Sequence, residues 1–169
     1  VVKKLLDAGA PDVVVAGWTA ACRAAFGGHA DVLAAIMAKG GAAAAAATPA
    51  GSSSMSPLLL ATLKGHVECA TMLLEAVPSA LEAPDAHGRT PLIVAASGGS
   101  VPMIDLLVSK GAALNATSAN GRTALMWAAK NGDEKMITTL LQLEGCDGRA
   151  KVRDVIVSQT YFSFFHIYA

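Results

Sequence analysis

Two stretches of the chain, GRTPLIVAASGG at residues 88–99 and GRTALMWAAKNG at residues 121–132, are nearly copies of each other. Corresponding residues of the two stretches lie 33 positions apart. Self-similarity at a fixed period of this length is the signature of a repeat array, in which each unit buries its apolar face only against its neighbours. The internal repeat therefore decides the fold before any single motif does.

Three further segments carry weaker copies of the same unit. SPLLLATLKGHVECATMLLE at residues 56–75 aligns with the copy that contains Thr90, at an offset of 34 residues. A fainter copy, GWTAACRAAFGGHADVLAAIMAKG, occupies residues 17–40, and VVKKLLDAGA at residues 1–10 resembles the end of a unit. The chain is thus expected to begin within a repeat and to be a fragment of a longer protein.

Each unit is expected to contain two short helices. Thr90 and Pro91 predict a helix start, because a Thr hydroxyl can accept from free backbone N–H groups and Pro at the first helical position loses nothing. This first helix is expected to have one apolar face and to stop at the glycines that end with Gly99. A second helix is predicted from Ser100 to the Gly111 stop. The Asn-Gly turn signal in LNATSANGRT then reverses the chain.

This pattern resembles the ankyrin repeat family. The resemblance rests on DAHGRTPLIVAASGGSVPMIDLLVSKGAALNA at residues 85–116 and SANGRTALMWAAKNGDEKMITTLL at 118–141, with GHVECATMLL at 65–74 in support. It covers about residues 14–146 and implies an all-α solenoid of stacked helix-turn-helix units with short hairpin loops. The histidine that the family usually carries after Thr-Pro-Leu is replaced in each copy, by Cys22, Leu59, Ile93 and Met126. A hydrogen bond of that histidine is then missing, so we expect below-average stability.

The resemblance also divides the chain. The predicted units are a partial ankyrin repeat at 1–13, an array at 14–149 with repeats at about 14–39, 51–83, 84–116 and 117–149, an insert at 40–54 and an atypical apolar tail at 150–169. The insert, GGAAAAAATPAGSSS, is low in complexity and is predicted to be a flexible link. The tail holds five of the six Phe and Tyr residues of the chain. It either packs on the last repeat, binds a continuation of the chain or is a non-native extension.

Composition excludes several functions. The 13 basic and 13 acidic side chains cancel, so no net field favours nucleic acid or an anionic membrane. The chain has no leader peptide pattern and no apolar run of spanning length, so no membrane contact is predicted. Its three cysteines are odd in number and lack CxxC spacing, which favours a cytoplasmic or nuclear location.

Candidate chemistry is equally sparse. The four histidines share no metal-ligand spacing, so no metal is expected. The sequence SGGS at residues 97–100 lacks the Lys-Ser/Thr of a phosphate-binding loop, and no cofactor is expected. Cys22 and Cys69 fall on predicted core positions, which favours packing over nucleophilic catalysis. No catalytic residue is therefore proposed, and the chain is predicted not to be an enzyme.

What remains is a surface. In an ankyrin-like stack the hairpin tips and the exposed side of the first helices form a concave strip. The predicted partner-binding residues on this strip are Trp18, Phe26, Ser53, Met55, Lys64, Ala86, His87, Arg89, Ser97, Ala119, Asn120, Arg122 and Lys130. The arginines recur one repeat apart and are expected either to pair with carboxylates of an extended or helical partner or to be ordinary solvated charges. Trp18 or Phe26 would supply an apolar anchor, and Trp127 is assigned to helix packing.

The sequence therefore predicts a monomeric, non-catalytic protein–protein interaction module, a scaffold or adaptor that binds another protein of unknown identity. An alternative is the recognition arm of a larger multidomain enzyme or channel. A purely mechanical spacer is a third possibility, because fold does not fix function.

Overall fold

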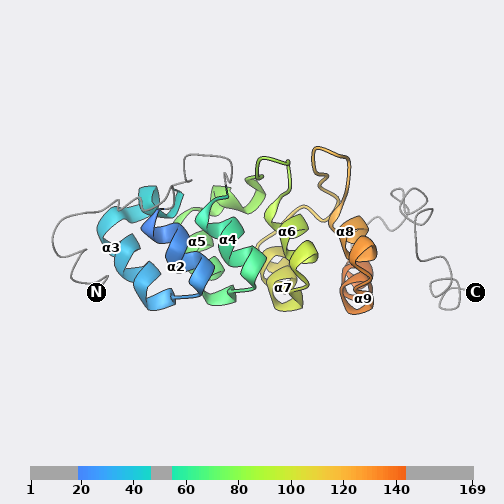
Figure 1. The fold of residues 1–169 in the computed structure, drawn as a ribbon, viewed down its shortest axis with the longest axis horizontal. Helices are drawn as coiled ribbons and strands as arrows, with labels where there is room; N and C mark the ends of the chain where they lie inside the picture. Colours follow the sequence, from blue (N-terminus) through green and yellow to red (C-terminus); the bar gives the residue numbers. More distant parts are fainter. Residues whose placement is uncertain (1–18, 47–54, 144–169) are drawn as a thin grey trace, which may run out of the picture.

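The computed structural model describes residues 19–46 and 55–143, which form a row of four helix pairs (Figure 1). The elements are α2 (Ala20–Gly27), α3 (Ala30–Ala46), α4 (Pro57–Lys64), α5 (Val67–Ala76), the 3-10 helix η1 (Pro78–Glu82), α6 (Pro91–Gly98), α7 (Val101–Ser109), α8 (Ala124–Asn131) and α9 (Glu134–Gln142). The described residues contain no strand. The predicted all-α solenoid of helix-turn-helix units is confirmed. The partial repeat at 1–13, Trp18, Ser53 and the tail at 150–169 lie outside the described residues.

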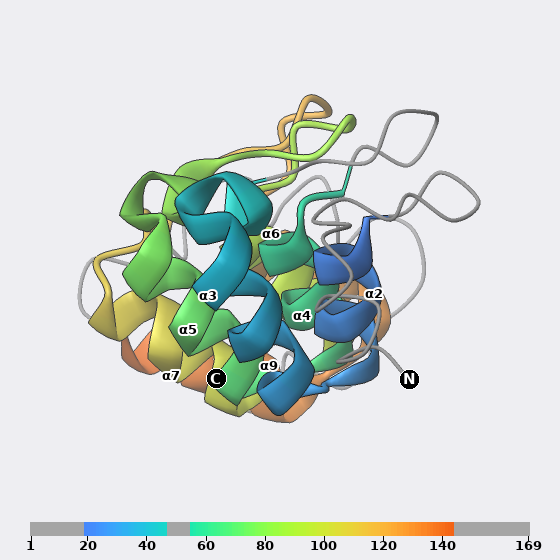
Figure 2. The ribbon, with the colours of Figure 1, turned by 90° about the vertical axis from the view of Figure 1, so that its left-hand side faces the viewer.

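The helices form two layers. The first helices of the pairs, α2, α4, α6 and α8, pack side by side in chain order, and α3, α5 and α7 of the second layer do the same. The hairpin loops at residues 84–90 and 117–123 project from the same side of the row, at the top of the view in Figure 1. Figure 2 shows both loops leaning over the layer of first helices. One face of the molecule is therefore made of first helices and hairpin loops together.

The first helices begin and end in nearly the same way. The hydroxyls of Thr19, Ser56 and Thr123 each accept a hydrogen bond from the backbone N–H three residues later. Each first helix ends at a glycine with a φ of 69–74°, a left-handed conformation that favours Gly. The predicted side-chain cap at Thr90 is wrong, because its buried Oγ1 has no hydrogen-bond partner. Pro91 already fixes the backbone of that first turn, so the helix starts without the hydroxyl.

The core lies between the two layers. Every residue from Leu92 to Ala96 is buried, so the prediction of a single apolar face on α6 is wrong. The reason is that α4 and α8 flank α6 while α7 lies behind it. Fully buried alanines such as Ala25, Ala61 and Ala128 let these helices approach closely. Apolar side chains also fill the four positions where the histidine was expected.

The predicted flexible insert at 40–54 is corrected in its first part. Helix α3 continues to Ala46, so residues 40–46 are helical. Alanine has the highest helix propensity, and its run outweighs the cost of the two glycines before it. Ala45 is buried within the core cluster. Residues 47–54 lie outside the described residues.

Candidate partner-binding surface

The hairpin loop at residues 85–89 is organised around one buried carboxylate. The backbone N–H groups of His87 and Arg89 donate to Asp85 Oδ1, each at 2.9 Å. Arg89 Nε and Nη2 lie 2.7 and 2.6 Å from Asp85 Oδ2, and only 2% of the Asp85 side chain is exposed. Burial favours the neutral acid, but the hydrogen bonds from Arg89 and His87 and the charge of Arg89 together hold the pKa of Asp85 below its usual value.

The next hairpin loop, at residues 118–122, has the same backbone with a different side chain at its start. Ser118 stands where the previous unit has Asp85, and its Oγ accepts from Arg122 N at 3.3 Å. Within residues 19–46 and 55–143 the guanidinium of Arg122 makes no ion pair. The two predicted arginines are therefore not equivalent, because Arg89 is held by a carboxylate of its own loop and Arg122 is not.

The two hairpin loops also contact each other. Ala119 N donates to the carbonyl oxygen of His87 at 3.0 Å. A Cβ on Gly88, which has a φ of +70°, would lie 2.6 Å from Ala119 N, so the loops can approach this closely only because residue 88 is Gly. The side chains at the loop tips, Ala86, His87, Ala119 and Asn120, are exposed. Those four predicted residues are thus placed together at one edge of the first-helix layer.

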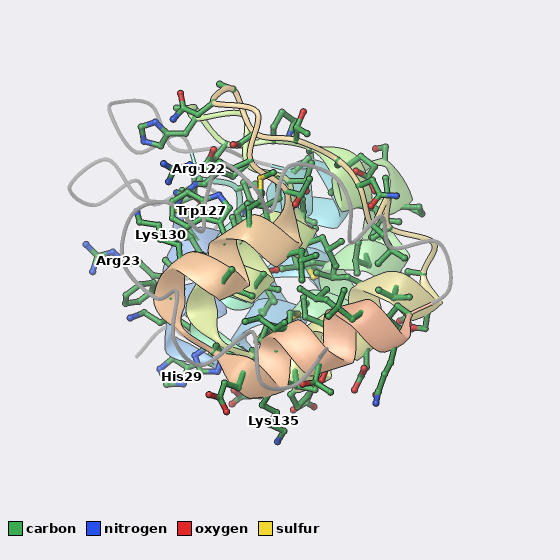
Figure 3. The ribbon with its side chains drawn as sticks, turned by 90° about the vertical axis from the view of Figure 1, so that its right-hand side faces the viewer. Arg23, His29, Arg122, Trp127, Lys130 and Lys135 are labelled. Carbon is green, nitrogen blue, oxygen red and sulfur yellow. The ribbon has the colours of Figure 1, made fainter. Side chains whose placement is uncertain are left out.

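Three cations surround the ring of Trp127 on α8. Lys130 Nζ lies 4.8 Å from the ring centroid, and the Cζ atoms of Arg122 and Arg89 lie 5.7 and 6.0 Å away. We call Trp127, Arg89, Arg122 and Lys130 the Trp127 cluster. Figure 3 shows Arg122, Trp127 and Lys130 together beneath the hairpin loops. The Trp127 side chain is half-buried, and its Nε1–H is buried without an acceptor.

A second group of predicted residues lies on α2 and α4. Lys64 Nζ is 4.5 Å from the centroid of the Phe26 ring, which is 37% exposed. His66 Nε2 lies 3.1 Å from the carbonyl oxygen of Phe26, so this contact also joins neighbouring repeats. Met55 is half-buried, and its carbonyl oxygen lies 3.9 Å from Cys22 Sγ. This part of the surface is more apolar than the Trp127 cluster.

Ser97, the remaining predicted residue, lies on α6. Its carbonyl oxygen accepts a hydrogen bond from Asn131 Nδ2 of the next repeat at 3.1 Å. Its half-buried side chain lies near the end of α6. Ser97 therefore takes part, through its backbone, in joining two repeats.

The repeat architecture agrees with a comparison against protein families. Residues 75–152 match the family model of ankyrin repeats in three copies. Residues 75–152 carry ankyrin repeats. Such repeats are generally protein–protein interaction modules and are typically non-catalytic. A comparison with curated proteins gave no match.

Reactive groups are scarce on the described ankyrin repeats. Residues 19–46 and 55–143 hold no group of three or more His, Cys, Asp or Glu side chains that could bind a metal ion. Cys22 and Cys69 are buried, and burial raises the pKa of both thiols, with the charge of Glu68 adding to the effect at Cys69. They are protonated near neutral pH and unreactive. None of the described helices is both long and apolar enough to span a membrane.

Trp127 packs partly against the core, as predicted, but sequence reasoning missed the three cations around its ring. Trp127 in TALMWAA matches Val94 in TPLIVAA, which favoured the packing role. The available signal was the charge beside it, because Arg122 and Lys130 flank Trp127 in the sequence at positions that the repeat places on the same face. An aromatic residue between two such cations indicates a cation–π cluster, which Trp127 forms in addition to its core contact.

Proposed function

We propose that the described ankyrin repeats are a non-catalytic scaffold or adaptor that binds a partner protein through the first-helix face. This name denotes the exposed side chains of α2, α4, α6 and α8 and of the hairpin loops at residues 84–90 and 117–123. The observation that carries the proposal is variation at a fixed position. The equivalent position in three repeats holds Phe26, Ser97 and Lys130. The helix caps and the buried alanines of the same repeats, by contrast, are almost unchanged.

That contrast indicates that different residues serve folding and partner recognition. Buried positions must keep their size because the helices pack closely. This one position of the first helices carries an aromatic ring, a small hydroxyl and a cation in three of the repeats, so the stack does not depend on the chemistry of its side chain. A face that tolerates such differences can be specific for one partner without cost to the fold. A cytoplasmic or nuclear location is part of the proposal, because the three cysteines of the chain are odd in number and lack CxxC spacing.

The test uses the whole chain and lysines on both sides of the row. Ligands are first selected from a random peptide library displayed on phage. The chain is then treated with an acetylating reagent with and without a selected peptide, and modified lysines are quantified by mass spectrometry. Lys64 and Lys130 report on the first-helix face, whereas Lys110 and Lys135 report on the second helices, and all four are exposed.

Protection of Lys64 and Lys130 together with unchanged acetylation of Lys110 and Lys135 is the expected result. Protection confined to Lys110 and Lys135 would place the peptide on the second helices and would contradict the proposed first-helix face. If selection yields no peptide that binds the folded chain, the interaction role itself fails.

A further inference from the structure

Charge is divided unevenly between the two sides of the described repeats. The first helices and the two hairpin loops carry five basic side chains and one acidic side chain, namely Arg23, Lys64, Arg89, Arg122, Lys130 and Asp85. The second helices, η1 and the links around them carry three basic and seven acidic side chains. The zero net charge of the chain thus conceals a positive face and a negative face.

The single carboxylate of the positive face is already engaged. Asp85 is buried beneath Arg89 and accepts three hydrogen bonds from its own loop, and it also forms an ion pair with Arg89 Nη2. Arg122 and Lys130 have no such partner among the residues that the structure describes. Two uncompensated cations are therefore held within 6 Å of one ring centroid, where they repel each other.

The Trp127 cluster offers hydrogen-bond donors and lacks acceptors. Arg122 presents a planar guanidinium that suits bidentate contact with a carboxylate, and Lys130 presents an ammonium. The indole Nε1–H of Trp127 is a further donor without an acceptor. Arg122 is half-buried, so an ion pair formed there is screened less by water than one at a fully exposed site.

We infer that the first-helix face binds an acidic peptide segment of its partner, and that Arg122 and Lys130 hold one carboxylate of that segment beside the Trp127 ring. This inference rests on the proposed function and names the chemistry of the partner. A peptide fits better than nucleic acid, because phosphate-backbone binding depends on an extended cationic surface, whereas the second side of these repeats is acidic. Arg89 contributes charge to the cluster, but its hydrogen-bond donors are turned to Asp85.

The neighbouring repeat suggests a sharp test. Ser118→Asp places a carboxylate beside Arg122 at the position where Asp85 holds Arg89. The substitution should occupy Arg122 while leaving the loop backbone, which both repeats share, intact. Arg122→Gln removes the charge directly, and Lys135→Gln on α9 is the matched control on the opposite face.

The probe is a fluorescein-labelled peptide of alternating Glu and Ala residues, titrated with the whole chain and followed by fluorescence anisotropy. The matched peptide of alternating Gln and Ala is the neutral control. We expect Ser118→Asp and Arg122→Gln each to weaken binding about fivefold or more, and Lys135→Gln to change it by less than about twofold. In a Trp18→Phe background, the emission of Trp127 should also change when the acidic peptide binds.

Several outcomes would overturn the inference. Equal binding of the Glu and Gln peptides, or no effect of Ser118→Asp, would remove the carboxylate site, and the proposed function would stand if selected peptides still protected Lys64 and Lys130. Tighter binding of a phosphoserine peptide or of single-stranded DNA would assign the cluster to phosphate. Concentration-dependent self-association that Ser118→Asp abolishes would make a second copy of the chain the occupant.

Discussion

The hairpin loop at residues 85–89 and the hairpin loop at residues 118–122 follow the same path with different chemistry. In both, the first residue donates its N–H to the carbonyl oxygen of the arginine, and the glycine N–H donates to the carbonyl oxygen of the first residue. The first side chain is Asp85 in one loop and Ser118 in the other. The backbone path is therefore set by the turn itself, whereas the side chain at its start decides whether the arginine is held or available.

The largest expected difference between the loops concerns their glycines. Gly88 and Gly121 have φ values of +70° and +69°, so alanine is strained at both. A Cβ at residue 88 would also clash with the backbone of Ala119, whereas nothing lies within 4 Å of one at residue 121. We expect Gly88→Ala to lower the free energy of unfolding by about 3 kcal/mol and Gly121→Ala by about 1 kcal/mol. Urea unfolding measures both, and equal losses would mean that the loops do not pack as described.

The next effect comes from exchanging the first side chains of the loops. Asp85→Ser should lower the free energy of unfolding by about 2 kcal/mol, because it removes an ion pair and leaves the guanidinium of Arg89 without its acceptor. Ser118→Asp should raise the same quantity by up to about 1 kcal/mol by supplying that acceptor to Arg122. Thermal or urea unfolding of the two variants beside the parent is the measurement. An unchanged stability in Asp85→Ser would show that the buried carboxylate is not needed.

The pH dependence of stability should also distinguish the loops. The pKa of Asp85 is lower in the folded chain than its usual value, so its contribution is fully present above about pH 4 and is lost as the pH falls through the lowered pKa. The stability of the parent should therefore fall more steeply below about pH 4 than that of Asp85→Asn, which has no such titration. Urea midpoints measured from neutral to acidic pH test this. Parallel curves for the two proteins would contradict the assignment.

The smallest expected difference concerns the threonines that precede α6 and α8. Thr123 Oγ1 accepts from Met126 N at 3.4 Å, whereas Thr90 Oγ1 is buried without a partner. Thr123→Val should cost about 1 kcal/mol of unfolding free energy, and Thr90→Val should change it by less than about 0.5 kcal/mol. Helix content by circular dichroism serves as the control for both. A larger loss at Thr90 would indicate that its hydroxyl caps α6 after all.

The sequence was sufficient to predict the repeated helix pairs, because the signals that start and end each helix are local. Caps at Thr19, Ser56 and Thr123 and the left-handed glycines are each fixed by a few neighbouring residues, so a 33-residue period predicts the order of the helices. The extent of α3 was not predicted, because a run of alanines is compatible with both a linker and a helix. In the structure these residues are helical, and Ala45 packs against the core.

The sequence predicted which residues lie on the candidate surface better than it predicted how those residues pair. Exposed positions follow from the repeat, but pairing depends on which carboxylate reaches which cation in three dimensions. Arg89 and Arg122 look identical in the sequence, and the difference between them arises at residues 85 and 118, four positions earlier. The approach of Arg89 to Trp127 likewise depends on two adjacent repeats, whereas Arg122 and Lys130 lie close to Trp127 in the sequence.

The opposite charges of the two sides give the described repeats an electric dipole across the row of helices. A dipole of this kind experiences a torque in the field of a nearby charge, so a negatively charged segment turns the positive side toward itself before contact is made. Such steering raises the rate of productive encounters rather than the lifetime of the complex, and dissolved salt weakens it. A molecule without net charge can therefore approach a partner in a preferred orientation.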